Sequence, residues 1–265
     1  MISLSIFYYI VITILLVSIF LYMWYAYNLI NYENNIDNLI EYNNKIIPSD
    51  LSDFCMQKIL SKKEAILFAK NVKSHQKYWK TKNILMYILG TASYLEGAKG
   101  KDLYITEYNK TNKFLYKHYK PLYDKVLDYF QKRVPHSTVK YRFAYPGFHI
   151  FKCNKLFSLP VASVHIDKQY LNLTLNDDED IDYDKTLSFT LCLELPPTGG
   201  GLYKFENNKK TKVIYKPGYI VCHNGKTSHM IAPSPAPNDD NTHYRITLQG
   251  HGLYDKKKNI WWLYW

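Results

Sequence analysis

Residues 186–195 read TLSFTLCLEL, and this stretch decides the class of fold. Leu and Phe occupy the odd positions, and the even positions carry Ser, Thr, Cys and Glu. This period of two predicts a β-strand with one buried face and one more polar face. Pro196, Pro197 and the GGG run at 199–201 predict a turn, and residues 202–205 begin another strand. Short strands separated by turns predict an antiparallel sandwich or barrel.

Helical signals precede this region. Residues 61–64 read SKKE, a capping box in which Glu64 can bond the backbone N–H of the cap residue. Apolar residues then follow at helical spacing, so we expect a helix that begins near Ser61. A second helix is predicted over about 111–132, with a break or kink at Pro121.

The N-terminal segment has a different composition from the rest. Residues 1–32 contain no Asp, Glu, Lys, Arg or His, and residues 2–30 are mostly apolar with aromatic residues near both ends. A bilayer core takes roughly 20 such residues in a helix. The basic start of a signal peptide is missing, and the apolar run is too long for one.

These features divide the chain into four predicted parts. Residues 1–30 are expected to form a single-pass transmembrane anchor, and residues 31–50 a stalk. Residues 51–136 form a helical support region, and residues 137–265 the β domain. Because no Lys or Arg precedes Lys45, we expect the catalytic domain in a lumen or outside the cell.

Composition and charge exclude several other classes. The 265 residues are 47% hydrophobic, which is enough for a folded core. A net charge of +11 suits an anionic partner, but we find no nucleic-acid-binding motif, so no nucleic-acid partner is expected. The four cysteines include no CxxC pair, which argues against a zinc finger or a thioredoxin-like site; they can form two disulfides or none.

A group of polar residues carries the chemistry. His165 and Asp167 lie two residues apart in a predicted strand at 161–167, so both side chains are on one face and can grip one metal ion. His229 supplies a third ligand after a predicted strand and an Asn-Gly turn. His223 is its rival, although its place beside the turn favours a local hydrogen bond.

The stretch 244–250, YRITLQG, alternates again and directs Arg245 and Thr247 to the barrel interior. A buried Arg needs an anionic partner, and its planar fork suits a carboxylate in two-point contact. Two His and one carboxylate on one face of an iron ion leave three coordination positions open.

Residues 138–255 resemble the Fe(II)/2-oxoglutarate-dependent dioxygenases, in particular the prolyl-hydroxylase-like branch. The matching pattern is His-x-Asp at 165–167, a distal His at 229 and Arg-x-Ser/Thr at 245–247. The Gly-Gly turn before 202–205 and the Pro-Gly turn at 217–218 lie between these motifs, in the same order as the corresponding turns of that family. Prolyl hydroxylases usually have Lys where this chain has Arg245, which leaves the substrate branch open.

The resemblance implies an α+β chain with a mainly β core, a double-stranded β-helix or jelly roll, with the N-terminal helices packed outside it. It implies that His165, Asp167 and His229 hold Fe(II). It also implies that Arg245, helped by Thr247, holds the far carboxylate of 2-oxoglutarate. We also expect ascorbate as an optional cofactor.

The implied activity is that of an oxidoreductase that hydroxylates a C–H bond of a protein side chain or small molecule, with release of succinate and CO₂. The acidic run 177–184 is either a solvated loop or a lid that selects a basic substrate. Two alternatives stay open: a non-catalytic, membrane-anchored structural protein with a degenerate jelly roll, and a cupin-like metal enzyme that uses no 2-oxoglutarate.

Overall fold

A computed structural model describes residues 4–33, 50–82, 86–158, 162–207, 209–235 and 242–265. The chain divides into two compact units, Met1–Leu39 and Ile40–Trp265. The first unit contains the helix α1 (Leu4–Glu33). The expected transmembrane anchor over residues 1–30 is not supported, because no helix among the described residues is both long and apolar enough to cross a bilayer. Most of the expected stalk, residues 34–49, lies outside the described residues.

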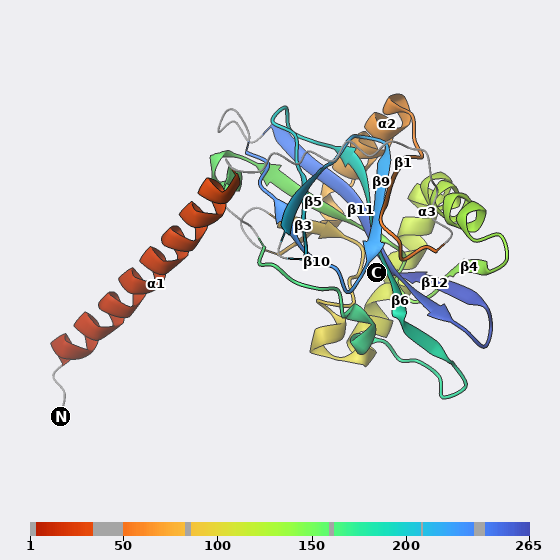
Figure 1. The fold of residues 1–265 in the computed structure, drawn as a ribbon, viewed down its shortest axis with the longest axis horizontal. Coiled ribbons are helices and arrows are strands. Elements are labelled where there is room, and N and C mark those ends of the chain that lie inside the picture. Colours follow the sequence, from red (N-terminus) through yellow and green to blue (C-terminus); the bar gives the residue numbers. More distant parts are fainter. Residues whose placement is uncertain (1–3, 34–49, 83–85, 159–161, 208, 236–241) are drawn as a thin grey trace. The chain divides into compact units, whose positions relative to one another are not determined.

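A nine-stranded sheet forms the core of the second unit (Figure 1). Its strands follow the order β1-β9-β6-β11-β5-β3-β2, while β12 pairs with β11 and β4 pairs with β12. The strands are β1 (Cys55–Lys58), β2 (Lys80–Thr81), β3 (Met86–Leu89), β4 (Thr138–Tyr141), β5 (Gly147–Cys153), β6 (Ile181–Glu194), β9 (Tyr219–Asn224), β11 (His243–Asp255) and β12 (Ile260–Tyr264).

A smaller sheet contains β10 (Ser228–Ala232), β7 (Gly201–Glu206) and β8 (Lys209–Ile214), in the order β10-β7-β8. Along the chain, β6, β9 and β11 belong to the large sheet, and the strands between them belong to the small one. The chain therefore passes repeatedly between the two sheets. The predicted mainly β core is confirmed.

Two helices, α2 (Lys62–Ser74) and α3 (Lys101–Arg133), pack on the large sheet (Figure 1). Their apolar side chains form one buried cluster with residues of β5, β6, β9 and β11. Short 3-10 helices cover Gln76–Tyr78, Gly97–Lys99, Lys155–Ser158 and Gln169–Asn172.

The predicted helix start at Ser61 is confirmed. The Glu64 backbone N–H donates to Ser61 Oγ at 3.2 Å, and the Ser61 backbone N–H donates to the Glu64 carboxylate at 2.7 Å. The second helix starts earlier than predicted, at Lys101, and it continues through Pro121. Buried residues on both sides of the proline, such as Tyr119 and Leu122, fix the helix to the sheet and compensate for the lost hydrogen bond.

Two strand predictions need correction. The strand at 186–195 begins earlier, so residues 181–184 of the acidic run belong to β6 rather than to a loop. Its apparently polar face is buried as well, because Ser188 and Thr190 face a cavity between the two sheets. The predicted strand at 161–167 is reduced to one β-bridge at His165, and residues 159–161 lie outside the described residues.

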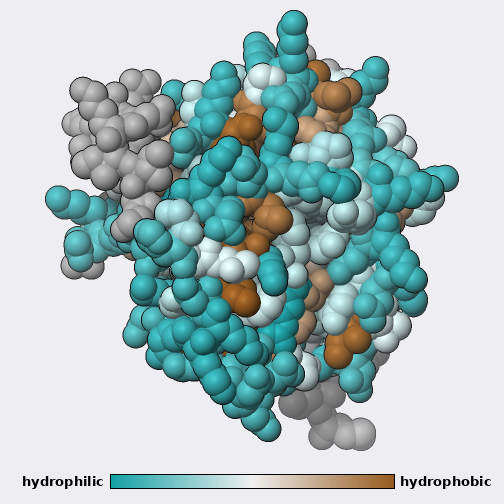
Figure 2. Space-filling view, turned by 90° about the vertical axis from the view of Figure 1, so that its right-hand side faces the viewer, coloured by the Kyte–Doolittle hydropathy of each residue, from teal (hydrophilic) through white to brown (hydrophobic). Residues whose placement is uncertain are grey.

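The surface seen in Figure 2 is mostly hydrophilic, with apolar residues in small separate patches. Part of the high charge is paired on α3, where Lys120 contacts Asp124 and Lys132 contacts Asp128 one turn apart. Exposed pairs of this kind are screened by solvent and add little to the stability of the fold.

The capping box gives a stability prediction. Ser61→Ala removes the oxygen that accepts the Glu64 N–H, so the free energy of unfolding should fall by about 1 kcal/mol in a urea titration. Ser61→Thr keeps that oxygen and should lose much less. Equal losses in the two variants would show that the hydroxyl is not the source of the effect.

Candidate metal centre

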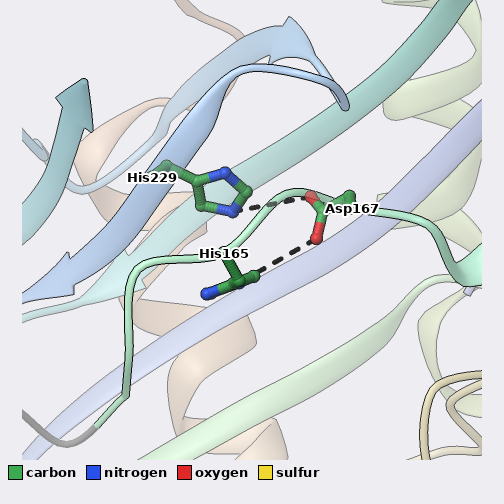
Figure 3. Close-up of side chains that lie close together, drawn as sticks. All are labelled: His165, Asp167 and His229. Carbon is green, nitrogen blue, oxygen red and sulfur yellow. Dashed lines mark ion pairs between the residues drawn. The ribbon is translucent and has the colours of Figure 1, made fainter. Parts of the chain in front are cut away.

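His165, Asp167 and His229 lie together at the edge of the small sheet (Figure 3). One ligand atom from each residue lies within 4.8 Å of the others. An antiparallel bridge sets this arrangement: His165 N–H donates to His229 O at 3.0 Å, and His229 N–H donates to His165 O at 2.9 Å. The backbone thus fixes two of the predicted ligands side by side before any metal is considered.

Both imidazole rings are oriented by backbone carbonyls. His165 Nδ1 lies 2.8 Å from Ser163 O, and His229 Nδ1 lies 2.9 Å from Thr227 O. A carbonyl only accepts, so each Nδ1 carries a proton, and the neutral form of each ring has its lone pair on Nε2. The Nε2 atoms lie 4.0 Å (His165) and 3.5 Å (His229) from the Asp167 carboxylate. This tautomer is the one that a metal-binding histidine requires.

The Asp167 carboxylate is held from both sides. Ser188 Oγ donates to Oδ2 at 2.5 Å, and Gln169 Nε2 donates to Oδ1 at 2.7 Å. The Asp167 backbone N–H donates to Gly225 O at 2.7 Å, in the turn that precedes His229. Each carboxylate oxygen still has a lone pair for a metal.

The electrostatics favour a cation at this point. Burial acts to raise the pKa of Asp167, but positive charge on the neighbouring histidines and the Ser188 bond would hold it well below its usual value. Burial, however, lowers the pKa of His229 and His251, so these rings are neutral at neutral pH. A buried carboxylate surrounded by neutral rings is costly unless a cation neutralises it.

The centre lines a cavity of about 310 Å³, whose walls come from both sheets. Asp167 and His229 are buried, whereas the His165 side chain is 41% exposed. Its apolar lining includes Phe151, Leu202 and Ile231. Such a cavity shields the carboxylate and leaves one side accessible near His165.

Arg245 lines the same cavity and is 1% exposed. Its guanidinium carbon lies 5.4 Å from the ring centres of Phe151 and Tyr215. Among the described residues, neither Nε nor Nη1 has a hydrogen-bond partner. The predicted burial of Arg245 is therefore confirmed, and its fork is available to an anion.

Thr247 is also buried, and within the described part of the chain its hydroxyl has no partner. In the sheet it stands opposite His149. It is absent, however, from the described residues that line the cavity. The role assigned to it beside Arg245 stays a prediction.

His149, on β5, was missed by the sequence analysis. Its Nε2 lies 2.6 Å from the Tyr94 hydroxyl, and its buried Nδ1 has no partner in the described residues. Burial and then the charge of Arg245 lower the pKa of His149 to about 3, so the ring is neutral. Burial raises the pKa of Tyr94, which therefore keeps its proton and donates to Nε2. His149 Nδ1–H is thus a second unpaired donor beside Arg245.

Lys152 and Tyr170, two polar residues close in sequence to the site residues, are not among the described residues that line the cavity. Lys152 places its ammonium 5.3 Å from the ring centre of Tyr87, and Tyr170 packs against Tyr183. Alternation along β5 explains the difference, because His149 and Phe151 face the cavity while Lys152 faces away.

His223 and His251 also line the cavity. His223 bonds Asn224 O through Nδ1 at 2.9 Å, the local contact that was expected. His251 was not identified by the sequence analysis, and its Nδ1 lies 3.2 Å from Ser188 Oγ and 3.8 Å from Asp167. It continues the odd-numbered face of β11 that carries Arg245, and extending that period would have found it.

The acidic run is largely neutralised by basic residues. Its ion pairs are Asp178 and Glu179 with Lys258, Glu179 with Arg142, Asp180 with Lys256, and Asp184 with Lys226. Little charge is then left for a basic substrate. Recognition of such a substrate stays a prediction.

Comparison with known proteins gives weak matches. No protein-family model and no curated protein matches the chain. A Burkholderia ambifaria N-substituted L-amino acid dioxygenase in complex with alpha-KG is 10% identical, with a TM-score of 0.48 over 80% of this chain and 86% of that one. A Burkholderia pseudomallei oxidoreductase of the 2OG-Fe(II) oxygenase family is 11% identical, with a TM-score of 0.45 over 79% and 91%.

A Pseudomonas putida prolyl-4-hydroxylase is 15% identical, with a TM-score of 0.38 over 75% of this chain and 90% of that one. Identities and TM-scores this low assign neither a family nor an activity. The functional assignment therefore depends on the side-chain geometry.

Ser188 gives a prediction for the centre. Ser188→Ala removes the 2.5 Å bond to Asp167, so affinity for Co(II), measured by competition with a chelator, should fall roughly ten- to a hundredfold. The control is Thr190→Val, further along β6, which removes a hydroxyl that bonds Tyr215 instead. Unchanged affinity in Ser188→Ala would show that Asp167 does not depend on this bond.

Proposed function

We propose that the protein is an Fe(II)- and 2-oxoglutarate-dependent dioxygenase built on a double-stranded β-helix. One observation carries the proposal: a His-Asp-His group and a buried Arg with unpaired donors line the same cavity. The passage of the chain between two sheets, from β6 to β11, supports the jelly-roll assignment.

The side chains of the candidate metal centre match the ligands that Fe(II) prefers. Two imidazoles and one carboxylate form the donor set that non-haem Fe(II) oxygenases use, with other coordination positions left open. His165, Asp167 and His229 would hold Fe(II), and Ser188 and Gln169 would keep the carboxylate oriented. When bound, Fe(II) together with 2-oxoglutarate and dioxygen would supply the oxidising chemistry that hydroxylates a C–H bond with release of succinate and CO₂.

The residues also suit the dicarboxylate. The Arg245 fork binds the carboxylate far from the metal in two-point contact, and neutral His149 adds an N–H donor without adding charge. Phe151 and Tyr215 flank the guanidinium and exclude water from it. The substrate, a protein side chain or a small molecule, would approach along the accessible side near His165.

A titration of the full chain tests the proposal. Under anaerobic conditions, Fe(II) should bind, and added 2-oxoglutarate should produce a visible absorption band that is absent with either component alone. Admission of oxygen should then release succinate. Metal binding without any response to 2-oxoglutarate would favour the cupin-like alternative, and absence of metal binding would favour the structural one.

His229 and His223, two of the histidines that line the cavity, give a matched pair of variants. His229→Ala should abolish Fe(II) binding, because it removes one of three ligands, and the circular dichroism spectrum should stay unchanged. His223→Ala, whose ring packs 4.6 Å from His229, should have a mild effect. The opposite result would mean that the distal ligand is His223.

Arg245 gives the cosubstrate prediction. Arg245→Lys keeps the charge but loses the two-point geometry, and a lost charge-assisted hydrogen bond costs about 1.5–3 kcal/mol. The KM for 2-oxoglutarate should therefore rise roughly ten- to a hundredfold, with Fe(II) affinity nearly unchanged. An unchanged KM would make Arg245 structural and remove the main support for 2-oxoglutarate.

A further inference from the structure

Cys55 and Cys222 stand directly opposite each other in the antiparallel pair β1–β9. The Cα atoms of opposed residues in such pairs lie about 4.5 or 5.5 Å apart, depending on the type of pair. Both separations fall within the range of about 4.4–6.8 Å that a disulfide spans. Directly opposed side chains lie on the same face of a sheet, so a bond between the two thiols needs little movement of the backbone.

The pair lies outside the candidate metal centre. Both thiols belong to the buried cluster under α2 and α3, whereas the next residue, His223, faces the cavity. From α3, Tyr129 OH lies 3.1 Å from Cys55 Sγ, and the Arg133 guanidinium carbon lies 5.9 Å from the Tyr129 ring centre. A buried cation therefore lies close to two thiols that the proposed oxygenase chemistry does not use.

These contacts make Cys55 different from the other cysteines. The hydrogen bond from Cys222, followed by the charge of Arg133, lowers the pKa of Cys55 to about 6 against the opposing effect of burial. Burial raises the pKa of Cys153 and of Cys192 to about 12. The thiolate is the reactive form, so Cys55 is the nucleophile and the protonated Cys222 its neighbour.

Access to Cys55 is through the edge of the sheet. β1 is an edge strand of four residues, paired on one side with β9. Short edge strands open locally at a small fraction of the free energy of global unfolding. Cys55 is 9% exposed and Cys222 fully buried, so a small oxidant reaches Cys55 first.

We propose that Cys55 and Cys222 form a redox-active dithiol, which a peroxide converts to a disulfide linking β1 to β9. The Cys55 thiolate attacks one peroxide oxygen, the O–O bond breaks, and Cys55 becomes a sulfenic acid. The hydroxide that leaves takes up the proton that the Cys55 thiol released, which gives the first water. Cys222 sulfur then attacks the Cys55 sulfur, and its proton leaves with the hydroxyl as a second water. Both thiols are oxidised and one hydrogen peroxide is reduced to two waters.

The disulfide joins residues far apart in the sequence and fixes the edge strand to the strand that carries His223. A bond that closes so long a loop restricts the unfolded chain strongly. The oxidised protein is therefore more resistant to heat than the reduced protein. This inference does not depend on the proposed oxygenase activity.

The test treats the reduced full chain with one equivalent of hydrogen peroxide, followed by alkylation and peptide mass mapping. We expect a Cys55–Cys222 peptide pair lighter by two hydrogen atoms, with Cys153 and Cys192 alkylated as in the untreated protein. The midpoint of thermal unfolding should rise by about 5 °C or more and return with dithiothreitol. Alkylated Cys55 and Cys222 after treatment, or a disulfide between another pair, would overturn the proposal.

Variants separate the two steps. In Cys222→Ser, a sulfenic acid at Cys55 should persist and react with dimedone, because its partner thiol is missing. Cys153→Ala is the matched control, a buried thiol removed elsewhere, and should still form the disulfide. Two results would show that the assigned nucleophile is wrong. One is dimedone labelling of Cys222 rather than Cys55 in the wild type, and the other is dimedone labelling of Cys222 in Cys55→Ser.

Discussion

Burial of the Asp167 carboxylate is the constraint on which the site depends. An isolated buried carboxylate is so costly that its surroundings must compensate. Two side-chain donors and a backbone bond to Gly225 hold it in place, but the closest rings are neutral because burial lowers the pKa of His229 and His251. The Asp167 carboxylate therefore has its hydrogen bonds, but its negative charge is not neutralised. A divalent cation between His165, His229 and Asp167 would resolve that imbalance.

The strand β11 joins this site to the core. Its even positions, Ile246 and Leu248, belong to the apolar cluster beneath the helices, while its odd positions Arg245 and His251 face the cavity. A one-residue slip would exchange the two faces, putting Arg245 in the apolar cluster and Leu248 in the cavity. The packing of α2 and α3 therefore fixes the register that presents Arg245. Stability of the core and placement of the unpaired Arg245 fork depend on the same strand.

Local patterns in the sequence predicted the parts of the site that lie within one strand or turn. The two-residue alternation at 244–250 predicted that Arg245 points into the barrel. The order of the motifs predicted that His229 joins the pair at 165–167. His149 and Ser188 were missed because only strand pairing across the sheet brings them to the cavity, and Tyr94 was missed because it reaches the cavity from the turn that follows β3. Helix and strand lengths were underestimated for a related reason: tertiary packing carries α3 through Pro121 and extends β6 beyond its alternating segment. Hydropathy alone likewise predicted an anchor that the described helices do not support.

Unpaired buried donors are the clearest sign of what the cavity is for. Arg245 Nε and Nη1 and His149 Nδ1 have no partner among the described residues, and each such group typically costs about 1–3 kcal/mol. Apolar replacements at these positions would fold more stably, so folding alone does not explain them. Donors gathered in one cavity, with a neutral imidazole beside a permanent cation, match a carboxylate, which accepts several hydrogen bonds and carries one compensating charge. The same reasoning explains why Asp167, with its charge unbalanced, lies in the same cavity: a cation and a dicarboxylate would together satisfy both ends.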